Sequence, residues 1–230
     1  MKRCLVVVCL LTAAACGKSP TEPSNNNNSG GGPPQTNPAP APAPTNRAPV
    51  LNSLNFAPSF GVAGLTRFEF NSSASDADGD SLSYAWDVAG NPFTGTNGSI
   101  VFSSNSSGQG VARVTVSDGK TTTTDTRSFT VGSMTGTWRG TFDRWNFTSN
   151  LQQDSLGRLT GDYSDQLGAG RLDPAVANTI NAGAGVTIRY KQATFSDFTM
   201  TGTMDSTGRR ISGVVNGSGY TNAPFVMTKQ

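Results

Sequence analysis

Three aspartates around one glycine are the side chains in this chain whose spacing best suits chemistry. Asp76, Asp78 and Asp80 occupy alternate positions in the run Asp-Ala-Asp-Gly-Asp. Calcium takes oxygen ligands and favours carboxylates at this density. The same run also suits an Asx-turn loop, in which aspartate side chains accept hydrogen bonds from nearby backbone amides. The spacing therefore leaves both a calcium site and a capped turn open.

Four other aspartates, in the C-terminal part, could be imagined as the acid and base of a glycoside hydrolase. They are Asp162, Asp165, Asp173 and Asp197. Nothing in their spacing selects a pair, and we expect them to be solvated loop carboxylates. The chain has no histidine, which excludes Ser-His-Asp and Cys-His nucleophile systems and histidine-ligated zinc. We therefore expect no enzymatic activity and no required cofactor, with calcium as a possible ligand.

The charge of the chain is close to balanced. It carries 17 basic and 15 acidic residues, for a formal net charge of +2. Removal of Lys2 and Arg3 with an N-terminal segment would leave 15 of each sign. No basic run exceeds Arg209-Arg210, so the electrostatic pattern of a nucleic-acid binder is missing. The sequence carries no signal for an oligomeric state.

Residues 1–15 have the pattern of an export signal. A cationic start at residues 1–3 precedes an apolar run at 4–11, and three alanines lead up to Cys16. The apolar run is shorter than the roughly 20 residues that a membrane-spanning helix needs. A cysteine directly after small residues resembles the lipobox of bacterial lipoproteins, although Ala13 stands where that family usually has leucine. The alternative is ordinary secretion after cleavage at the alanines.

The lipoprotein resemblance implies that the Cys16 thiol is acylated and anchors the exported protein to the bacterial cell envelope. Gly17 follows the cysteine in place of the aspartate with which that family retains proteins in the inner membrane, so the outer membrane is favoured. The remaining cysteines, Cys4 and Cys9, lie in the signal, which leaves the mature chain no internal disulfide. Residues 16–46 are predicted to be the lipidated cysteine followed by a disordered linker rich in proline, asparagine and glycine.

Residues 47–132 are predicted to form an antiparallel β-sandwich, because short apolar segments alternate with turn residues. The expected strands fall at 62–70, 82–88, 111–116 and 128–131. Three motifs in order, Asn46-Arg-Ala-Pro-Val50, residues 74–80 leading into Ser83-Tyr-Ala-Trp86, and Val114-Thr-Val-Ser-Asp118-Gly119, resemble PKD and related cadherin-like domains. The resemblance implies an Ig-like fold with Trp86 in the core. Val88-Ala-Gly-Asn91 replaces the family's usual Gly-Asp-Gly.

The same resemblance bears on the aspartate run. Some PKD and cadherin-like domains bind calcium through this loop and residues near the start of the domain, which adds Asn46 to Asp76, Asp78 and Asp80. An EF-hand is excluded, because Asp87 stands where its twelfth-position glutamate would be and no helical pattern flanks the loop.

Residues 133–230 are predicted to be a second all-β domain. Seven alternating segments are expected as strands, at 136–142, 147–151, 159–163, 186–190, 198–204, 211–215 and 225–227. Hairpin turns are predicted at 154–157 and 205–208, where aspartate opens and glycine closes each turn. Closure into a small antiparallel up-and-down barrel would hide the sheet edges. Gly136-Thr-Trp138 and Leu159-Thr-Gly161 loosely resemble lipocalin-like and avidin-like barrels, and a second compact sandwich is the alternative.

The aromatic residues of this second domain could line a ligand cup or fill a core, and we expect most of them to be structural. Trp145 is expected at a barrel rim because Asp143-Arg144-Trp145-Asn146 interrupts the alternation. The full set is Trp138, Trp145, Phe147, Tyr163, Tyr190, Phe195, Phe198, Tyr220 and Phe225.

The predicted function is that of a non-catalytic, membrane-anchored lipoprotein. Its sandwich and barrel would serve recognition or adhesion at the cell envelope, with a protein or glycan partner and no nucleic acid. The alternative is a carrier that holds a small apolar ligand inside the barrel. Glycines at inward positions would make room for such a ligand, and Gly161, Gly202 and Gly213 are candidates.

Overall fold

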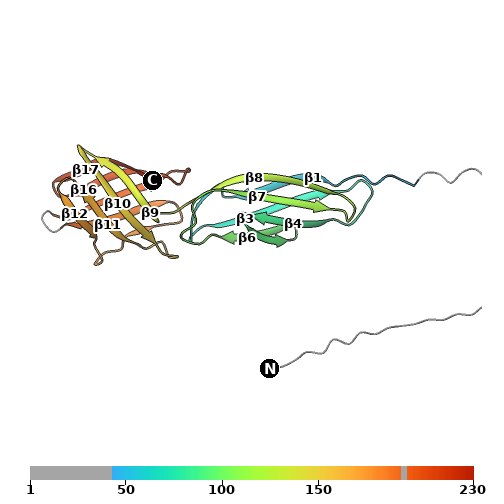
Figure 1. Ribbon diagram of the computed structural model, residues 1–230, viewed down its shortest axis with the longest axis horizontal. Coiled ribbons are helices and arrows are strands. Elements are labelled where there is room, and N and C mark those ends of the chain that lie inside the picture. Colours follow the sequence, from blue (N-terminus) through green and yellow to red (C-terminus); the bar gives the residue numbers. More distant parts are fainter. Residues whose placement is uncertain (1–42, 193–195) are drawn as a thin grey trace, which may run out of the picture. The chain divides into compact units, whose positions relative to one another are not determined.

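The computed structural model describes residues 43–192 and 196–230, and residues 44–230 form one compact unit. The predicted signal segment, the lipidation site and most of the linker lie outside these residues. All described elements are β-strands, as predicted (Figure 1). Within the described ranges, no helix has the length and apolar character needed to cross a membrane.

The N-terminal half is a sandwich of two sheets. One sheet has the strand order β1-β3-β6 and the other β2-β8-β7-β4-β5, with β2 and β8 parallel and the other neighbours antiparallel. The strands are β1 (Val50–Ala57), β2 (Phe60–Val62), β3 (Arg67–Ser75), β4 (Ser83–Val88), β5 (Asn91–Thr94), β6 (Asn97–Val101), β7 (Gly108–Ser117) and β8 (Thr122–Gly132). This arrangement confirms the predicted Ig-like sandwich.

The sandwich core lies between its two sheets and is rich in aromatic rings. Phe68, Phe70 and Phe129 are fully buried and pack on one another, and Trp86 joins them as predicted. The Trp86 indole donates a hydrogen bond of 2.9 Å to the carbonyl of Gly95. The single strand predicted at 62–70 is wrong: a turn at residues 63–65 separates β2 from β3, which lie in different sheets.

The segment that departs from the PKD pattern forms the tight hairpin between β4 and β5. Ala89 and Gly90 both have positive φ angles, 47° and 82°. The Asp87 side chain accepts a hydrogen bond of 2.8 Å from the Gly90 amide and caps this turn. Two successive positive φ angles are what a two-residue hairpin between twisted strands requires.

The C-terminal half is a closed barrel of eight antiparallel strands, as predicted. Consecutive strands pair, β17 pairs with β9, and β12 pairs with β14, which closes the sheet on itself. The strands are β9 (Gly136–Phe142), β10 (Trp145–Gln153), β11 (Leu159–Asp165), β12 (Gly168–Leu172), β14 (Gly185–Gln192), β15 (Phe198–Met204), β16 (Arg210–Gly217) and β17 (Tyr220–Lys229), with the short β13 (Thr179–Ile180) attached to β14.

The two repeated turn motifs of the sequence form the hairpins β10–β11 and β15–β16. Asp154 accepts hydrogen bonds from the amides of Leu156 and Arg158, and Gly157 has a φ of 76°. In the second turn Asp205 accepts a bond of 3.0 Å from Thr207, and Gly208 has a φ of 68°. Both predicted hairpins are confirmed.

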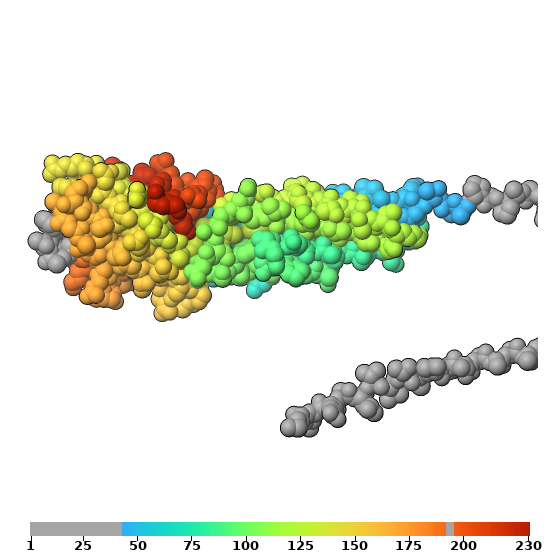
Figure 2. Space-filling view, in the orientation of Figure 1, coloured from blue at the N-terminus to red at the C-terminus, as the bar shows by residue number. Residues whose placement is uncertain are grey.

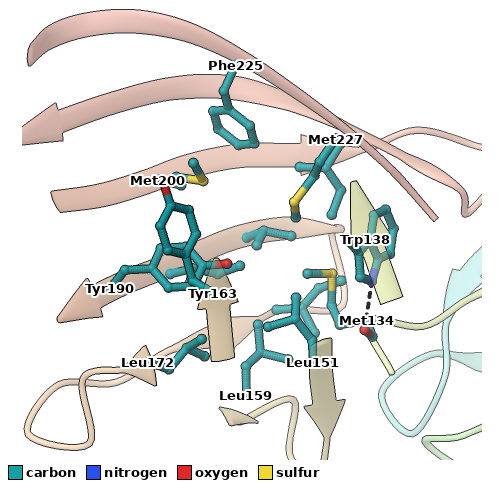
Figure 3. Close-up of a cluster of buried hydrophobic side chains, with 14 of the residues drawn as sticks. Met134, Trp138, Leu151, Leu159, Tyr163, Leu172, Tyr190, Met200, Phe225 and Met227 are labelled. Carbon is teal, nitrogen blue, oxygen red and sulfur yellow. Dashed lines mark hydrogen bonds between the residues drawn. The ribbon is translucent and has the colours of Figure 1, made fainter. Parts of the chain in front are cut away.

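The interior of the barrel is filled with side chains. Trp138, Tyr190 and Met200 are fully buried there, and the Trp138 indole donates a 2.8 Å hydrogen bond to the carbonyl of Met134 (Figure 3). The inward glycines 202 and 213 are paired across β15 and β16, and a Cβ on either would meet strand backbone within 2.5 Å. These glycines allow a close approach of strands and do not leave a hollow. On the face seen in Figure 2 the barrel wall is continuous.

A buried glutamine joins the barrel to the sandwich. Gln153, at the end of β10, donates a 2.7 Å hydrogen bond to the Ala63 carbonyl, and its side-chain oxygen accepts one of 2.9 Å from the Met134 amide. Val62 from β2 is fully buried among the apolar residues of the barrel. The sandwich half therefore contributes the Val62 side chain and the Ala63 carbonyl to the barrel core.

Candidate functional site

Three hairpin connections meet at one end of the barrel and frame a pocket there. In the β9–β10 turn, Asp143 has a φ of 49°, which ends the alternation and places Trp145 at the rim. In the β16–β17 turn, Ser218 has a φ of 52° between two glycines. In the β11–β12 turn, Asp165 accepts hydrogen bonds from the Leu167 and Gly168 amides, at 2.8 and 3.1 Å.

We call this cavity the mouth pocket. Its volume is about 190 Å³, and aromatic side chains make most of its wall. Phe142, Tyr163 and Phe198 form the floor, since they are almost fully buried, while Trp145 and Tyr220 are partly exposed. The complete lining is Phe142, Trp145, Tyr163, Asp165, Leu167, Phe198, Ser218 and Tyr220.

Two hydrogen bonds fix the polar groups of the mouth pocket. The Trp145 indole donates a 2.7 Å bond to the Tyr220 hydroxyl, which locks two rim aromatics together. The Tyr163 hydroxyl donates to the Asp165 carboxylate. Burial, reinforced by the negative charge of Asp165, raises the pKa of Tyr163 above its ordinary value. Tyr163 is therefore a neutral donor at physiological pH.

A second, larger hollow lies on the outer face of β9, β10 and β11. Its volume is about 620 Å³, and it is lined mostly by polar side chains, including Arg139 and Asn146 of the sheet and Gln166 of the β11–β12 turn. It is shallow and wide open, with exposed walls. The mouth pocket is the better candidate, because it is less open, and mostly apolar walls with a few placed polar groups are typical of small-ligand sites.

The other barrel aspartates have structural contacts. Arg189 bridges two of them, at 3.6 Å from the Asp173 carboxylate and 3.1 Å from that of Asp197. Asp162 accepts a 2.9 Å bond from the Asn150 amide group. The expectation that all four are solvated is wrong for Asp173, which is only 4% exposed. The backbone at Asp173 lies beside β14, where its amide donates a hydrogen bond to the Arg189 carbonyl.

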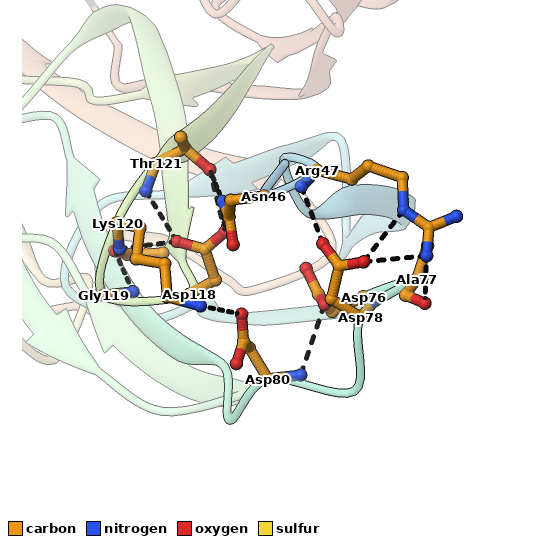
Figure 4. Close-up of polar contacts among 11 residues, drawn as sticks. Asn46, Arg47, Asp76, Ala77, Asp78, Asp80, Asp118, Gly119, Lys120 and Thr121 are labelled. Atoms are coloured by element: carbon orange, nitrogen blue, oxygen red, sulfur yellow. Dashed lines mark hydrogen bonds and ion pairs between the residues drawn. The ribbon is translucent and has the colours of Figure 1, made fainter. Parts of the chain in front are cut away.

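The aspartate run of the sandwich lies beside the chain entry at residues 46–47 (Figure 4). One carboxylate oxygen from each of Asp76, Asp78 and Asp80 lies within 4.8 Å of the others. Asp76 also accepts hydrogen bonds from the amides of Asp78 and Asp80, at 2.8 and 3.2 Å. The predicted Asx turn is thus present, and it gathers the predicted calcium ligands.

Asn46 lies in the same cluster and contacts Asp118, which was not among the predicted calcium ligands. Its amide nitrogen donates a 2.9 Å bond to Asp118, whose carboxylate also accepts bonds from Lys120 and Thr121. These bonds, the Thr121 amide first and the Asn46 side chain next, lower the pKa of Asp118 well below its usual range. Asp118 therefore adds a fourth negative charge.

Two cations face these four carboxylates. Arg47 binds Asp78 through its backbone amide and its guanidinium, which lowers the pKa of Asp78. Lys120 contacts Asp80 at 2.8 Å, and this hydrogen bond raises the pKa of Lys120. The cluster retains an excess of two negative charges. Two of its oxygens, Oδ1 of Asn46 and Oδ2 of Asp76, are buried and have no hydrogen-bond partner among residues 43–192 and 196–230.

Sequence reasoning found part of each site. The interrupted alternation correctly placed Trp145 at the rim, whereas Asp165 was expected to be a solvated loop carboxylate and not a pocket residue. Most other aromatics of the predicted set are core residues, as expected, and Phe195 lies outside the described residues. Tyr220 belonged to the aromatic set that could line a ligand cup, although a structural role was expected for most of that set, and Ser218 was missed. The Gly-Ser-Gly-Tyr run at 217–220 was the available signal for a tight turn at the rim.

No family model matches the chain, and no curated protein matches it. One solved structure, a carbohydrate-binding module of the β-sandwich superfamily, is 13% identical with a TM-score of 0.36, over 81% of this chain and 93% of that one. A likeness of that size carries no argument about this chain. Fold and geometry define an Ig-like sandwich joined to an eight-stranded barrel that has an aromatic pocket at its mouth.

Proposed function

We propose that this protein is a non-catalytic recognition protein that engages its partner through the mouth pocket, held at the bacterial cell envelope by a lipid on Cys16. The observation that supports recognition is the pocket itself, in which partly exposed Trp145 and Tyr220 stand over a buried aromatic floor. Aromatic side chains supply large contact area with little conformational entropy to lose. The absence of histidine and the structural contacts of the barrel aspartates support a non-catalytic role.

The filled interior limits what the mouth pocket can accept. Tyr163 and Phe198 pack edge to face beneath it, with ring centroids 5.3 Å apart, and Tyr190 lies directly behind them. A carrier of an apolar ligand would need these rings to move aside. We therefore favour a partner that presents one small group to the mouth over a ligand enclosed in the barrel.

Tryptophan fluorescence tests the proposal, because the three tryptophans have different surroundings. Trp86 and Trp138 are buried in the two cores, and Trp145 lies at the pocket. In a screen of oligosaccharides, peptides and small amines, a true ligand is expected to change the emission, and Trp145→Phe should remove that change. Calorimetry should show weaker binding for Tyr220→Ala, with exposed Leu156→Ala as the control. Binding that survives Tyr220→Ala unchanged would place the recognition site elsewhere.

We also propose that the aspartate cluster of the sandwich holds calcium. The two buried oxygens without partners and the excess of two negative charges support this proposal. Asn46, Asp76, Asp78 and Asp80 would supply the oxygen ligands, and the ion would neutralise the cluster and fix the chain entry against it.

Calcium is therefore expected to raise the melting temperature of the protein, and a chelator should reverse the effect. Sites of extracellular modules bind at about 10⁻⁴–10⁻³ M. At roughly 10 mM calcium, linkage then gives about 1.4–2.7 kcal/mol of stabilisation, or a few degrees. Asp76→Asn should remove the shift, while Asp205→Asn in the β15–β16 turn should keep it. If calcium leaves the melting temperature unchanged, residues 76–80 are only a capped turn.

A further inference from the structure

The chemistry of the mouth pocket points to the kind of group that it accepts, an inference that rests on the function proposed above. We propose that the pocket binds an alkylated ammonium group, with Asp165 as its counter-charge and the rim aromatics as its walls.

Asp165 brings to the pocket a negative charge that, in the described part of the chain, no ion pair balances. Its carboxylate accepts hydrogen bonds from the Leu167 and Gly168 amides and from the Tyr163 hydroxyl, and all three donors are neutral. Across residues 43–192 and 196–230, the ion pairs that form involve other carboxylates. The side chain is partly buried beside aromatic rings, where water screens its charge less than at an open surface.

The strongest hydrogen-bond donors of the pocket already have acceptors. The Trp145 indole N–H is bound to Tyr220, and the Tyr163 O–H is bound to Asp165. Among the described side chains that line the pocket, the hydroxyls of Tyr220 and Ser218 remain to donate to a ligand. An anionic group would meet a carboxylate and few donors. A sugar ring, which needs donors and acceptors together, would find a poor match, whereas a cation needs no donor at all.

The aromatic rings that line the cavity are steeply inclined to one another. Phe142 and Tyr220 are nearly perpendicular, at 86°, with centroids 5.4 Å apart, and Tyr163 and Phe198 meet at 69°. These rings surround a volume of about 190 Å³, which suits a compact head group. The negative faces of such rings attract cations, and desolvated sites attract them most strongly.

A cation already lies against one of these rings. The guanidinium carbon of Arg144 is 5.1 Å from the centroid of Trp145, although Arg144 does not line the cavity. The positive charge of Arg144, so close to the pocket wall, would repel a cationic ligand. A neutral ligand would not be repelled. Replacing Arg144 therefore tests the charge of the ligand in the opposite direction from replacing Asp165.

Choline and its uncharged isostere 3,3-dimethylbutan-1-ol are the probes, measured by calorimetry and by Trp145 emission on the full chain. Choline is expected to bind at least tenfold more tightly than the isostere. Asp165→Asn, which keeps an acceptor for Tyr163, should weaken choline about tenfold, a change of about 1.4 kcal/mol. Arg144→Gln should tighten choline severalfold. Both variants should leave the weak binding of the isostere unchanged.

Three results would each overturn the ammonium assignment. The first is equal binding of choline and the isostere, and the second is an unchanged choline affinity in Asp165→Asn. The third is no choline binding at 10-fold the concentration at which the tightest-binding other compound of the screen saturates the protein. A sugar or peptide ligand that depends on Tyr220 but not on Asp165 would overturn it too, while leaving the proposed recognition function intact. Choline, phosphocholine and phosphatidylcholine vesicles are then compared to identify the source of the ammonium group. Tighter binding to the vesicles indicates a lipid head group, and tighter binding to choline indicates a free solute. The melting temperature of each variant controls for folding.

Discussion

Replacing Cys16 with serine is expected to move the protein from the membrane fraction to the soluble fraction. Only the thiol of a lipobox cysteine can be acylated, and serine keeps nearly the same size without that thiol. The apolar run at residues 4–11 is too short to hold the chain in a bilayer by itself, since a spanning helix needs about 20 residues. A stable lipid anchor needs more than one acyl chain, which resemblance to the lipoproteins implies for Cys16.

The chain provides its own controls for this experiment. Cys4→Ser and Cys9→Ser change the same atom within the predicted signal, so both should stay in the membrane fraction and incorporate labelled fatty acid. Gly17→Asp should keep the anchor and move the protein toward the inner membrane. If the unaltered protein is already soluble, residues 1–15 are an ordinary secretion signal, and cleavage follows the alanines.

The strands that could be predicted are those whose side chains alternate. β14 and β15 have apolar residues at every second position, and their inward faces are buried as that pattern requires. β1 was missed because a bulge between Leu51 and Ser53 shifts its register and disturbs the period of two. β12, with the sequence Gly-Ala-Gly-Arg-Leu, has almost no alternation, yet it closes the barrel by pairing with β14. Closure depends on backbone pairing there and leaves little trace in the sequence.

The mouth pocket was only partly predictable for a related reason. The rim position of Trp145 can be predicted from the local sequence, because the turn at Asp143 interrupts the alternation. Its partner Tyr220 is 75 residues away, and the two meet only when β17 pairs with β9. Asp165 has no distinctive sequence context, and it becomes a pocket residue only because the fold places aromatic rings around it. Local patterns thus predicted the elements, whereas the site arises from contacts that closure creates.

The buried Gln153 should show how strongly the barrel and the sandwich depend on each other. Gln153→Leu keeps much of the side-chain volume but removes both hydrogen bonds, to the Ala63 carbonyl and from the Met134 amide. Both backbone groups belong to buried residues, so water has little access to replace the lost partner. An unsatisfied buried polar group costs about 1–3 kcal/mol, and two of them predict a loss of roughly 2–6 kcal/mol in the free energy of unfolding.

Urea unfolding of the full chain, followed by tryptophan emission, measures this loss. Gln152→Leu is the matched control, because Gln152 precedes Gln153 in β10 and its exposed side chain faces outward. Its effect should stay within about 0.5 kcal/mol, as is usual for surface changes. Because Trp86 and Trp138 report on the two cores, Gln153→Leu should also lower the cooperativity between them, splitting one transition into two. Equal midpoints for both glutamine variants would mean that Val62 and the neighbouring apolar contacts hold the junction without the glutamine.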